Sequence, residues 1–473
     1  MKTITIVGDN AYAVASAIIL KTRFRDYKIS LICSHKSKIT TGTTTAAFKD
    51  FSGLCGVSLV PIMQAGRCSF KWGTKFEGFT KNPYFDFRLD SPFQFDMGQY
   101  LFMYGKVIGN KLPFKKIIHP NLINSTVNKG QHPDQFHFDF ELVSKHLKQL
   151  AKEKDIKVIE DTITEVITEK DQIVAVKGKG TYSSDFFIDA TGEARVLIKH
   201  LHPKFLSLKE YLPTNEMISF STKDPKDYNC YTTVKRMKAG WLRSFPLWGS
   251  EEHRYVYNNK YISSENAHKE AEKVLGVKIK KITVEKFSNG YLKNPWIGNC
   301  CAIGNSAVCI EPLEETECGV AINQTFILMH YLTNYTSDDV DIYNAKHLRL
   351  VHNIRDFISL HYLVCHTDSK FWKELKIKIS ESLEHKLKVL KHRLPIHEDF
   401  SDRYLIFDAP HFIRVLYALG FFDVSKIKKE FNDLNFLIKE VAKVEWDRYT
   451  DSFKFKGLPH KRYLEYHYFY KND

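Results

Sequence analysis

The fold is decided by residues 3–13, which read Thr-Ile-Thr-Ile-Val-Gly-Asp-Asn-Ala-Tyr-Ala. The alternation up to Val7 predicts a buried strand, and the alanine-rich run that continues to Leu20 predicts a helix. A second strand, Lys-Ile-Ser-Leu-Ile-Cys, is expected at residues 28–33. Strand, helix and strand in this order predict a βαβ unit, which is the usual start of a parallel α/β sheet.

The turn between this strand and helix occupies the place of a GxGxxG dinucleotide-binding loop. The glycines of such a loop permit a tight turn and bring a pyrophosphate close to a helix N-terminus. Only Gly8 is kept, and Asn10 and Ala13 replace the other two glycines. Asparagine tolerates left-handed backbone better than most residues, so both a nucleotide loop and a plain strand-to-helix turn stay open. Cys33 and Ser34 stand where an acidic residue usually binds the ribose, which predicts a weaker hold on a nucleotide.

Composition excludes several classes of protein. The 473 residues include 69 Lys+Arg and 55 Asp+Glu, a net charge of +14 that favours anionic small molecules. The basic residues form no arginine-rich run, so we expect no nucleic-acid partner. The nine cysteines form no CxxC pair, and we expect no metal site and no disulfide framework. No apolar run approaches the roughly 20 residues of a membrane span, and no secretion signal is recognised, which predicts a cytoplasmic protein without a membrane partner.

Further segments along the chain carry a family resemblance. Asp-Ala-Thr-Gly at 189–192 and the segment 303–314, which begins Ile-Gly-Asn, resemble flavin-contacting segments of FAD-dependent aromatic monooxygenase-like proteins. Three more segments narrow the resemblance: Thr-Gly-Thr-Thr-Thr at 41–45, Ser-Phe-Lys-Trp-Gly at 69–73 and Glu-Pro-Leu-Glu-Glu-Thr at 311–316. Through them the chain resembles one branch of that superfamily, the flavin-dependent halogenases related to tryptophan halogenases. The lysine- and asparagine-rich composition is compatible with a phage-encoded member, which would act in the host cytoplasm.

The resemblance implies an α/β fold with three parts. These are an FAD-binding, Rossmann-like core of the aromatic monooxygenase type, an inserted substrate-binding sheet and a mostly helical C-terminal region. We expect residues 1–330 to form the FAD-binding module with interleaved substrate and tunnel segments. Residues 331–473 are expected to form the helical region, packed on the same body, and the resemblance assigns no role to residues 380–473.

The resemblance also implies a chemistry. Reduced FAD and O2 would oxidise a halide ion to hypohalous acid, which would travel to a separate pocket holding an indole, pyrrole or phenol. Lys71 would donate a hydrogen bond to this oxidant or form a haloamine, and Glu314 would polarise the oxidant or accept the ring proton. An ordinary lysine pKa of about 10.4 and a nearby carboxylate favour the charged donor. The alternative interpretation of Lys71 is a solvated strand lysine.

The remaining expected site residues form three sets. The FAD contacts implied by the resemblance are Gly8, Asn10, Ala11, Ala13, Gly42, Thr44, Thr45, Asp189, Gly192, Gly304, Asn305 and Pro312. The backbone N–H groups of Thr316 and Glu317 would face the halide. The substrate and tunnel set comprises Trp241, Phe245, Pro246 and Phe93, with Tyr84 as a further stacking candidate. Each set is also consistent with ordinary turns and buried core.

The sequence departs from the family pattern at several positions. The WxWxIP signature, which is associated with keeping substrate away from the flavin, reads Trp-Leu-Arg-Ser-Phe-Pro at 241–246, with Arg243 in place of the second tryptophan. Glu315 replaces a serine, and Thr43 replaces an acidic residue. A carboxylate beside a halide opposes anion binding unless it points away. Weak flavin and halide binding are therefore expected.

Three functions remain open at this level. The first is a halogenase using chloride, bromide or iodide, and the second is a flavin-dependent aromatic monooxygenase that adds oxygen instead. The third is a non-catalytic, flavoprotein-derived binding protein, motivated by Asn10, Ala13, Cys33 and Thr43. The family has no nicotinamide site of its own, so the resemblance implies a separate flavin reductase as a partner. A homo-oligomer is left open.

Overall fold

The computed structural model describes residues 2–36, 40–81, 83–87, 100, 103–105, 126–127, 133–363, 368–400, 402–452 and 457–469. The chain divides into two compact units that interleave along the sequence. The first unit comprises Met1–Cys68, Asp134–Asn215 and Lys286–Arg355, and the second comprises Ser69–Pro133, Glu216–Glu285 and Asp356–Asp473. The sequence suggests a different division, into residues 1–330 and 331–473. That division rests on the type of secondary structure rather than on compactness, and it stays a prediction.

The first unit is built on a six-stranded sheet in the order β21-β22-β13-β1-β2-β9. Its strands are β1 (Thr3–Asp9), β2 (Lys28–Lys36), β9 (Lys157–Ile159), β13 (Phe186–Asp189), β21 (Trp296–Ile297) and β22 (Cys300–Ala302). β1 pairs in parallel with β2 and β13, and helix α1 (Ala11–Arg23) connects β1 to β2. The predicted βαβ unit is therefore confirmed, and with it the α/β class.

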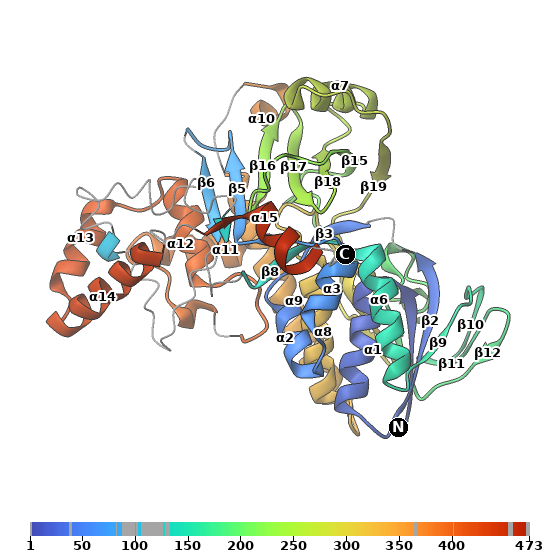
Figure 1. The fold of residues 1–473 in the computed structure, drawn as a ribbon. Helices are drawn as coiled ribbons and strands as arrows, with labels where there is room; N and C mark the ends of the chain where they lie inside the picture. Colours follow the sequence, from blue (N-terminus) through green and yellow to red (C-terminus); the bar gives the residue numbers. More distant parts are fainter. Residues whose placement is uncertain are drawn as a thin grey trace. The chain divides into compact units, whose positions relative to one another are not determined.

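Helices and smaller sheets complete the first unit. Helix α1 packs against α6 (Phe140–Glu153) and α8 (Glu317–Tyr331), and these helices lie side by side along the sheet (Figure 1). β3 (Thr41–Thr43) pairs antiparallel with β8 (Gln135–Asp139). The other elements are α2 (Ala47–Cys55), α3 (Leu59–Ala65), the sheet β10 (Glu165–Glu169), β11 (Gln172–Lys177) and β12 (Thr181–Tyr182), the sheet β14 (Phe205–Ser207), β20 (Gly290–Leu292) and β23 (Val308–Cys309), and the start of α9 (Ser337–His361).

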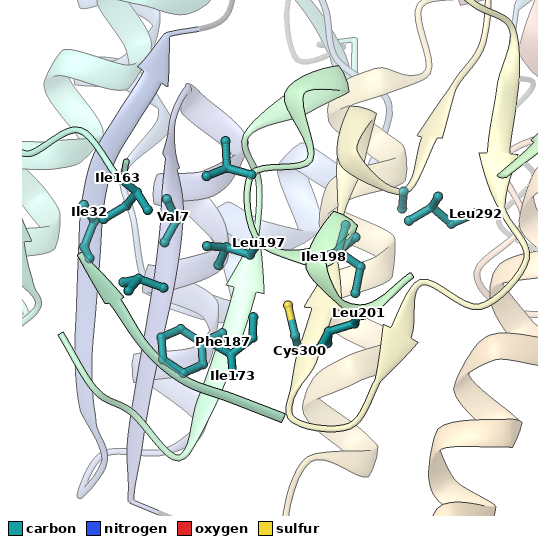
Figure 2. Packing of buried hydrophobic residues seen from close by; sticks show 14 residues of the cluster. Val7, Ile32, Ile163, Ile173, Phe187, Leu197, Ile198, Leu201, Leu292 and Cys300 are labelled. Atoms are coloured by element: carbon teal, nitrogen blue, oxygen red, sulfur yellow. The ribbon is translucent and has the colours of Figure 1, made fainter. Parts of the chain in front are cut away.

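An apolar cluster fixes one face of this sheet. Successive residues of a strand point to opposite faces, so Val7 lies on the face opposite to Ile6. Val7 packs there with Ile32 and Phe187 of the neighbouring strands, with β11, and with the short helix η2 (Ile198–Leu201), as Figure 2 shows. Each fully buried side chain of this size contributes about 1.5–3 kcal/mol. The cluster thereby holds the ends of β1 and β13, from which the candidate site begins.

The second unit contains a seven-stranded sheet in the order β19-β15-β18-β17-β16-β5-β6. Its strands are β5 (Gly73–Glu77), β6 (Tyr84–Phe87), β15 (Glu216–Lys223), β16 (Thr232–Met237), β17 (Gly240–Leu247), β18 (Ser250–Tyr257) and β19 (Thr283–Lys286), and β4 (Ser69–Lys71) precedes them. From β15 to β6 the neighbouring strands are antiparallel, except that β16 pairs in parallel with β5. This sheet corresponds to the inserted sheet that the sequence predicts.

Helices dominate the described C-terminal residues. They are α10 (Lys370–Glu374), α11 (Glu381–Leu390), α12 (Ala409–Ala418), α13 (Val424–Asp433), α14 (Phe436–Ser452) and α15 (His460–Leu464), and α7 (Ser264–Leu275) lies earlier in the same unit. A short strand, β24 (Leu458–Pro459), pairs with β7 (Thr126–Val127). Among the residues that the structure describes, none of the helices has the length and apolar character needed to cross a membrane.

Candidate active site

The first candidate site begins where β1 meets α1. A Cβ atom on Gly8 would lie 2.5 Å from the carbonyl oxygen of Ala190, a distance that real Cβ atoms essentially never show. Asn10 caps the helix, because its Oδ1 accepts from the Ala13 N–H at 2.9 Å while its Nδ2 donates to the Ala190 carbonyl at 2.8 Å. Its backbone is extended (φ −153°). The left-handed tolerance that the sequence suggests for Asn10 is therefore not used, and its amide ties the loop to β13 instead.

An ion pair beside this loop was not foreseen from the sequence. Lys148 Nζ lies 2.7 Å from Asp9 Oδ1. Burial alone would lower the pKa of Lys148, but the hydrogen bond to Asp9, together with interactions with Cys33 and the charge of Asp9, outweighs burial and holds the pKa above its ordinary value. Burial raises the pKa of Cys33 to about 11, although Lys148 opposes the shift. The residue that replaces the usual ribose-binding acid is thus a neutral thiol beside a lysine.

The Asp189 carboxylate is hydrogen-bonded to other residues of the protein. Its fully buried carboxylate accepts five hydrogen bonds of 2.7–3.0 Å. The donors are the N–H and hydroxyl of Thr191, the hydroxyl of Ser306, and the N–H groups of Leu197 and Ile198. Asp189 therefore holds the loop after β13, which contains Gly192 with φ +68°. Any contribution it makes to cofactor binding comes through the shape of this loop.

Gly304 brings three segments together. It has φ +55°, and a Cβ atom there would lie 2.7 Å from the Tyr12 ring. Its N–H donates to Gln324 Oε1 on α8 at 2.7 Å. Burial, and then the charge and hydrogen bond of the Glu317 carboxylate, raise the pKa of Tyr12 well above its ordinary value, and a backbone hydrogen bond of Asn305 opposes the shift. Tyr12 therefore belongs to the candidate site. The sequence motif did not indicate it, although it lies within the 8–13 loop.

The 311–317 segment is held by a buried polar network. Glu311, 1% exposed, accepts from the Thr214 hydroxyl at 2.5 Å, and its N–H donates to Asn289 Oδ1 at 2.6 Å. Glu314 is buried, and Glu315 has φ +51°, in the left-handed region that non-glycine residues rarely adopt. Strain of this kind costs on the order of 1–3 kcal/mol and is found at functional sites. Thr316 occupies the N-cap position of α8, which begins at Glu317, without a capping hydrogen bond from its side chain.

The 41–45 segment packs directly on this turn and on α8. A Cβ atom on Gly42 would lie 3.1 Å from the Phe140 ring and 3.3 Å from Glu315 Oε1. On α8, a Cβ atom on Gly319 would lie 2.2 Å from Thr45 Oγ1. Thr44 donates its N–H to the Phe136 carbonyl at 2.9 Å and accepts from the Phe136 N–H through its hydroxyl at 3.0 Å. The segments expected to face the flavin and the halide are thus neighbours in the first unit.

Two features of these residues fit an FAD. Glycines let the candidate segments pack closely, since a Cβ on Gly8, Gly42 or Gly304 would meet Ala190, Phe140 or Tyr12 of the protein itself. The N-termini of α1 and α8, both suited to anionic groups, are linked through Tyr12 and Glu317. Within the described part of the chain, no group of His, Cys, Asp and Glu residues is arranged to hold a metal ion.

The second unit carries Lys71 at the end of β4. Lys71 is 4% exposed, so the alternative of a solvated strand lysine is wrong. Its strand is held by neighbours on either side: the Ser69 hydroxyl donates to the Pro246 carbonyl at 2.6 Å and the Trp72 N–H donates to the Cys230 carbonyl at 2.7 Å. Glu314 belongs to the first unit, and its pairing with Lys71 stays a prediction.

The 241–246 signature lies on β17 and is buried. Trp241 is 0% exposed and donates from Nε1 to the Tyr362 hydroxyl at 3.0 Å. Arg243 is 1% exposed, and its guanidinium carbon lies 4.7 Å from the centre of the Phe245 ring. Burial, followed by the charge of Arg254, lowers the pKa of Arg243 well below its ordinary value. The predicted tunnel role of Trp241, Phe245 and Pro246 stays a prediction.

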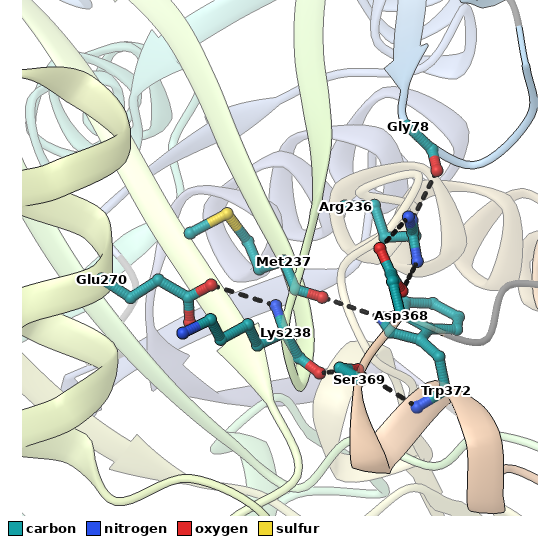
Figure 3. Close-up of polar contacts among 8 residues, drawn as sticks. All are labelled: Gly78, Arg236, Met237, Lys238, Glu270, Asp368, Ser369 and Trp372. Carbon is teal, nitrogen blue, oxygen red and sulfur yellow. Dashed lines mark hydrogen bonds and ion pairs between the residues drawn. The ribbon is translucent and has the colours of Figure 1, made fainter.

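A polar clamp fastens residues 368–372 to the hairpin before β17 (Figure 3). Arg236 makes two 2.7 Å hydrogen bonds to Asp368. The Ser369 hydroxyl donates to the Lys238 carbonyl at 2.6 Å, and Trp372 Nε1 donates to the Met237 carbonyl at 2.7 Å. Trp372 also stacks on Tyr362, the partner of Trp241, with ring centres 5.9 Å apart. The clamp thereby supports the position of Trp241.

Two expected aromatic contacts have different outcomes. Phe93 lies outside the described residues. The Tyr84 hydroxyl is 2.7 Å from His361 Nδ1, and its ring stacks on Phe76 at 4.9 Å between ring centres. Tyr84 is thus packed inside the unit, and its role as a stacking platform stays a prediction.

Comparisons with known proteins identify the family and the fold of this chain. A family model described as tryptophan halogenase matches residues 3–426. The tryptophan 6-halogenase SttH of Streptomyces toxytricini is 27% identical over 311 residues, which cover 62% of this chain and 58% of that protein. The 7-chloro-L-tryptophan 6-halogenase KtzR of Kutzneria sp. (strain 744) is 25% identical over 454 residues, which cover 84% of this chain and 87% of that protein. The crystal structure of a tryptophan halogenase from Shewanella frigidimarina NCIMB 400 has the same fold, with a TM-score of 0.88, 19% identity, and coverage of 99% of this chain and 98% of that chain.

Proposed function

The chain belongs to the tryptophan halogenase family, and from that premise we propose that it is a flavin-dependent halogenase in which Lys71 directs hypohalous acid onto a small electron-rich aromatic substrate. The observation that carries the proposal is the burial of Lys71, which is 4% exposed. Removing an ammonium group from water is unfavourable unless its surroundings compensate for the loss. A buried lysine on a short, tethered strand is therefore suited to holding its ammonium group in a fixed position within a site, rather than to contact with solvent.

Bound FAD, delivered reduced by a separate flavin reductase, would supply the chemistry that converts O2 and halide into hypohalous acid. The N-terminus of α1, which begins at Ala11, would take the pyrophosphate, and Ala13, whose N–H donates to Asn10, would keep this turn in place. Asp189 would act through the loop that carries Gly192. The remaining backbone contacts would come from Gly8, Gly42, Thr44, Thr45, Gly304, Asn305 and Pro312.

The halide would bind at the start of α8, through the N–H groups of Thr316 and Glu317. A helix N-terminus favours an anion. Two features weaken this site: the Glu315 carboxylate reaches Gly42 nearby, and the Glu317 carboxylate bonds to Tyr12. Carboxylates close to an anion oppose its binding. Bromide and iodide, which are easier to oxidise than chloride, are expected to react first.

The transfer step follows from the two catalytic side chains. Lys71 Nζ donates a hydrogen bond to the oxygen of hypohalous acid and draws electron density from the O–halogen bond. The aromatic carbon forms a bond to the halogen as the O–halogen bond breaks, and the oxygen leaves as hydroxide, which takes the proton that Lys71 donates and becomes water. Glu314 accepts the proton that the ring carbon then releases. Aromatic compound and hypohalous acid give halogenated product and water.

The test is a mass-spectrometric assay of wild type and Lys71→Ala with flavin reductase, FAD, NADH and a panel of indoles, pyrroles and phenols. Each of chloride, bromide and iodide is supplied in turn. Halogenated product from wild type alone, with equal NADH-driven flavin reoxidation in both proteins, is the expected result. Equal product from both would show free hypohalous acid and remove Lys71 from the transfer step.

One observation keeps an aromatic monooxygenase as the second candidate. Arg243, a buried residue, stands where the family signature has its second tryptophan. The same assay separates the two, because a monooxygenase adds oxygen to the substrate instead of halogen. Neither product, together with no FAD-induced thermal shift, would instead indicate the non-catalytic binding protein.

A further inference from the structure

The C-terminal segment 457–469 contacts the strand that carries Lys71. This segment contains β24 and α15 and lies beyond the 3–426 match to the family model. The Nε2 atom of His460 accepts a hydrogen bond of 3.0 Å from the backbone N–H of Phe70. Phe70 directly precedes Lys71, so a side chain near the C-terminus bonds to the backbone beside the proposed catalytic lysine.

This bond requires one protonation state of His460. Nε2 can accept from an N–H only when it carries no proton, which means that the ring is neutral and its proton is on Nδ1. His460 is 0% exposed. Burial lowers its pKa to about 3, against the opposing effect of the backbone carbonyls of Asn229 and Tyr228. The acceptor is therefore present throughout the pH range in which an enzyme of this kind would be assayed.

The same segment covers one face of β4. Neighbouring residues on a strand point to opposite faces, so the Phe70 side chain lies opposite to that of Lys71. The Phe70 ring packs against the rings of His460, Tyr463 and Tyr468, with ring centres 5.6, 5.9 and 5.9 Å away. The segment thus packs against the Phe70 face of β4, and the Lys71 side chain lies on the opposite face.

The supporting segment is itself anchored. Lys461 Nζ lies 2.6 Å from Asp224 Oδ2 and 2.9 Å from the Pro225 carbonyl. Phe469 stacks on Trp248 with ring centres 4.4 Å apart. A segment held at both ends can fix the position of a three-residue strand that has little length of its own for strand pairing.

We propose that His460 is a positioning residue for Lys71: by accepting the Phe70 N–H, it fixes the backbone from which the lysine meets the oxidant. The inference rests on the proposed function, because it concerns the same transfer step. A misplacement of about 1 Å at a reacting group can reduce a rate about 100-fold. Loss of the acceptor should therefore separate oxidation of halide, which Lys71 does not perform, from halogenation of the substrate.

Two substitutions distinguish positioning from packing. His460→Gln keeps an acceptor oxygen within reach of the Phe70 N–H but loses the ring. His460→Phe keeps the ring and its stacking but loses the acceptor. His467→Phe is the matched control, because His467 lies in the same segment and is exposed. Each variant is assayed for halogenated product per NADH consumed and for hypohalous acid captured by a soluble β-diketone.

Positioning predicts that His460→Phe loses at least tenfold in product per NADH while captured hypohalous acid rises. It also predicts that His460→Gln stays within about threefold of wild type and that His467→Phe is unchanged. The opposite order, with His460→Phe active and His460→Gln inactive, would assign His460 to packing and overturn the proposal.

Hydrogen exchange at residues 69–72 tests the contact between His460 and Phe70 directly. It can be measured even if a variant is poorly active or no substrate in the panel reacts. The Phe70 amide should exchange slowly in wild type and in His460→Gln, and at least tenfold faster in His460→Phe. Equal exchange in all three proteins would overturn the positioning role. If Lys71→Ala halogenates as well as wild type while exchange follows the predicted order, the proposed function fails and the contact itself stands.

Discussion

Acid should loosen the loop at Gly304 through one buried histidine, His347. Its Nε2 lies 3.1 Å from the Leu292 carbonyl, which can only accept, so Nε2 carries the proton. Its Nδ1 lies 3.1 Å from the amide nitrogen of Gln324, which can only donate. Gln324 Oε1 in turn accepts from the Gly304 N–H at 2.7 Å. A second proton on His347, at Nδ1, would face the N–H donor of Gln324. It would break this series of hydrogen bonds.

The magnitude follows from the pKa of His347 in the folded and unfolded states. Burial lowers it to about 3 in the folded protein, against the opposing hydrogen bond to Leu292, and the charge of His352 adds to the lowering. The unfolded value is about 6.5. Since the folded pKa is the lower one, the unfolded chain binds more protons between the two values, and stability is lost as pH falls from about 6.5 towards about 3. Between pH 7 and pH 5 this amounts to about 2 kcal/mol.

The assay compares urea unfolding of wild type and His347→Gln at pH 7 and pH 5. Glutamine can donate to Leu292 and accept from Gln324 without titrating, so the loss of stability between the two pH values should be about 2 kcal/mol smaller in the variant. Burial also lowers the pKa of His253 and His460, but both residues are present in both proteins and cancel in the difference. His385→Gln, at an exposed position, is the control. Identical pH dependence of wild type and His347→Gln would refute the reasoning.

Three further outcomes are expected. Asn10→Ala removes the α1 cap and should lower the free energy of unfolding by about 1 kcal/mol and weaken FAD binding measured by fluorescence quenching; unchanged values would contradict the capping role. Gly319→Ala should destabilise the protein in urea despite the better helix propensity of alanine, because its Cβ would lie 2.2 Å from Thr45 Oγ1; addition of Thr45→Gly should restore stability, and failure to do so would locate the clash elsewhere. Glu315→Gln should lower the halide concentration for half-maximal rate about fivefold by removing a charge worth about 1 kcal/mol; an unchanged value would place that carboxylate away from the halide.

The βαβ opening was predictable because its signals are local, whereas the FAD contacts of the candidate loops stay a prediction. Strand alternation and an alanine-rich helix are properties of a few adjacent residues. Gly8 is different: the motif marks its position, but the requirement for glycine comes from a tertiary contact, because a Cβ there would lie 2.5 Å from the carbonyl oxygen of Ala190. Asn10 shows the limit of such reasoning. The sequence suggested a tolerated backbone conformation, whereas the side chain serves as a helix cap and a bond to β13.

Other features could not be read from the sequence because they depend on tertiary contacts. The pairing of Lys148 with Asp9, the engagement of Tyr12 with Glu317 and the burial of Lys71 each join segments far apart in the chain. The residues around Lys71 are compatible with both a solvated and a buried strand, since alternation alone does not identify what covers each face. Only the packing of β4 separates the two.

The difference between local and distant support has a consequence for function. A cofactor loop binds through backbone groups, so its requirements are glycines and caps, and a family motif records them. A buried lysine must be shielded and held, and the groups that hold its strand can come from any part of the chain. Here one of them is His460, which the family match to residues 3–426 does not reach. His460→Phe should therefore reduce halogen transfer while leaving FAD binding unchanged, whereas Asn10→Ala should weaken FAD binding itself.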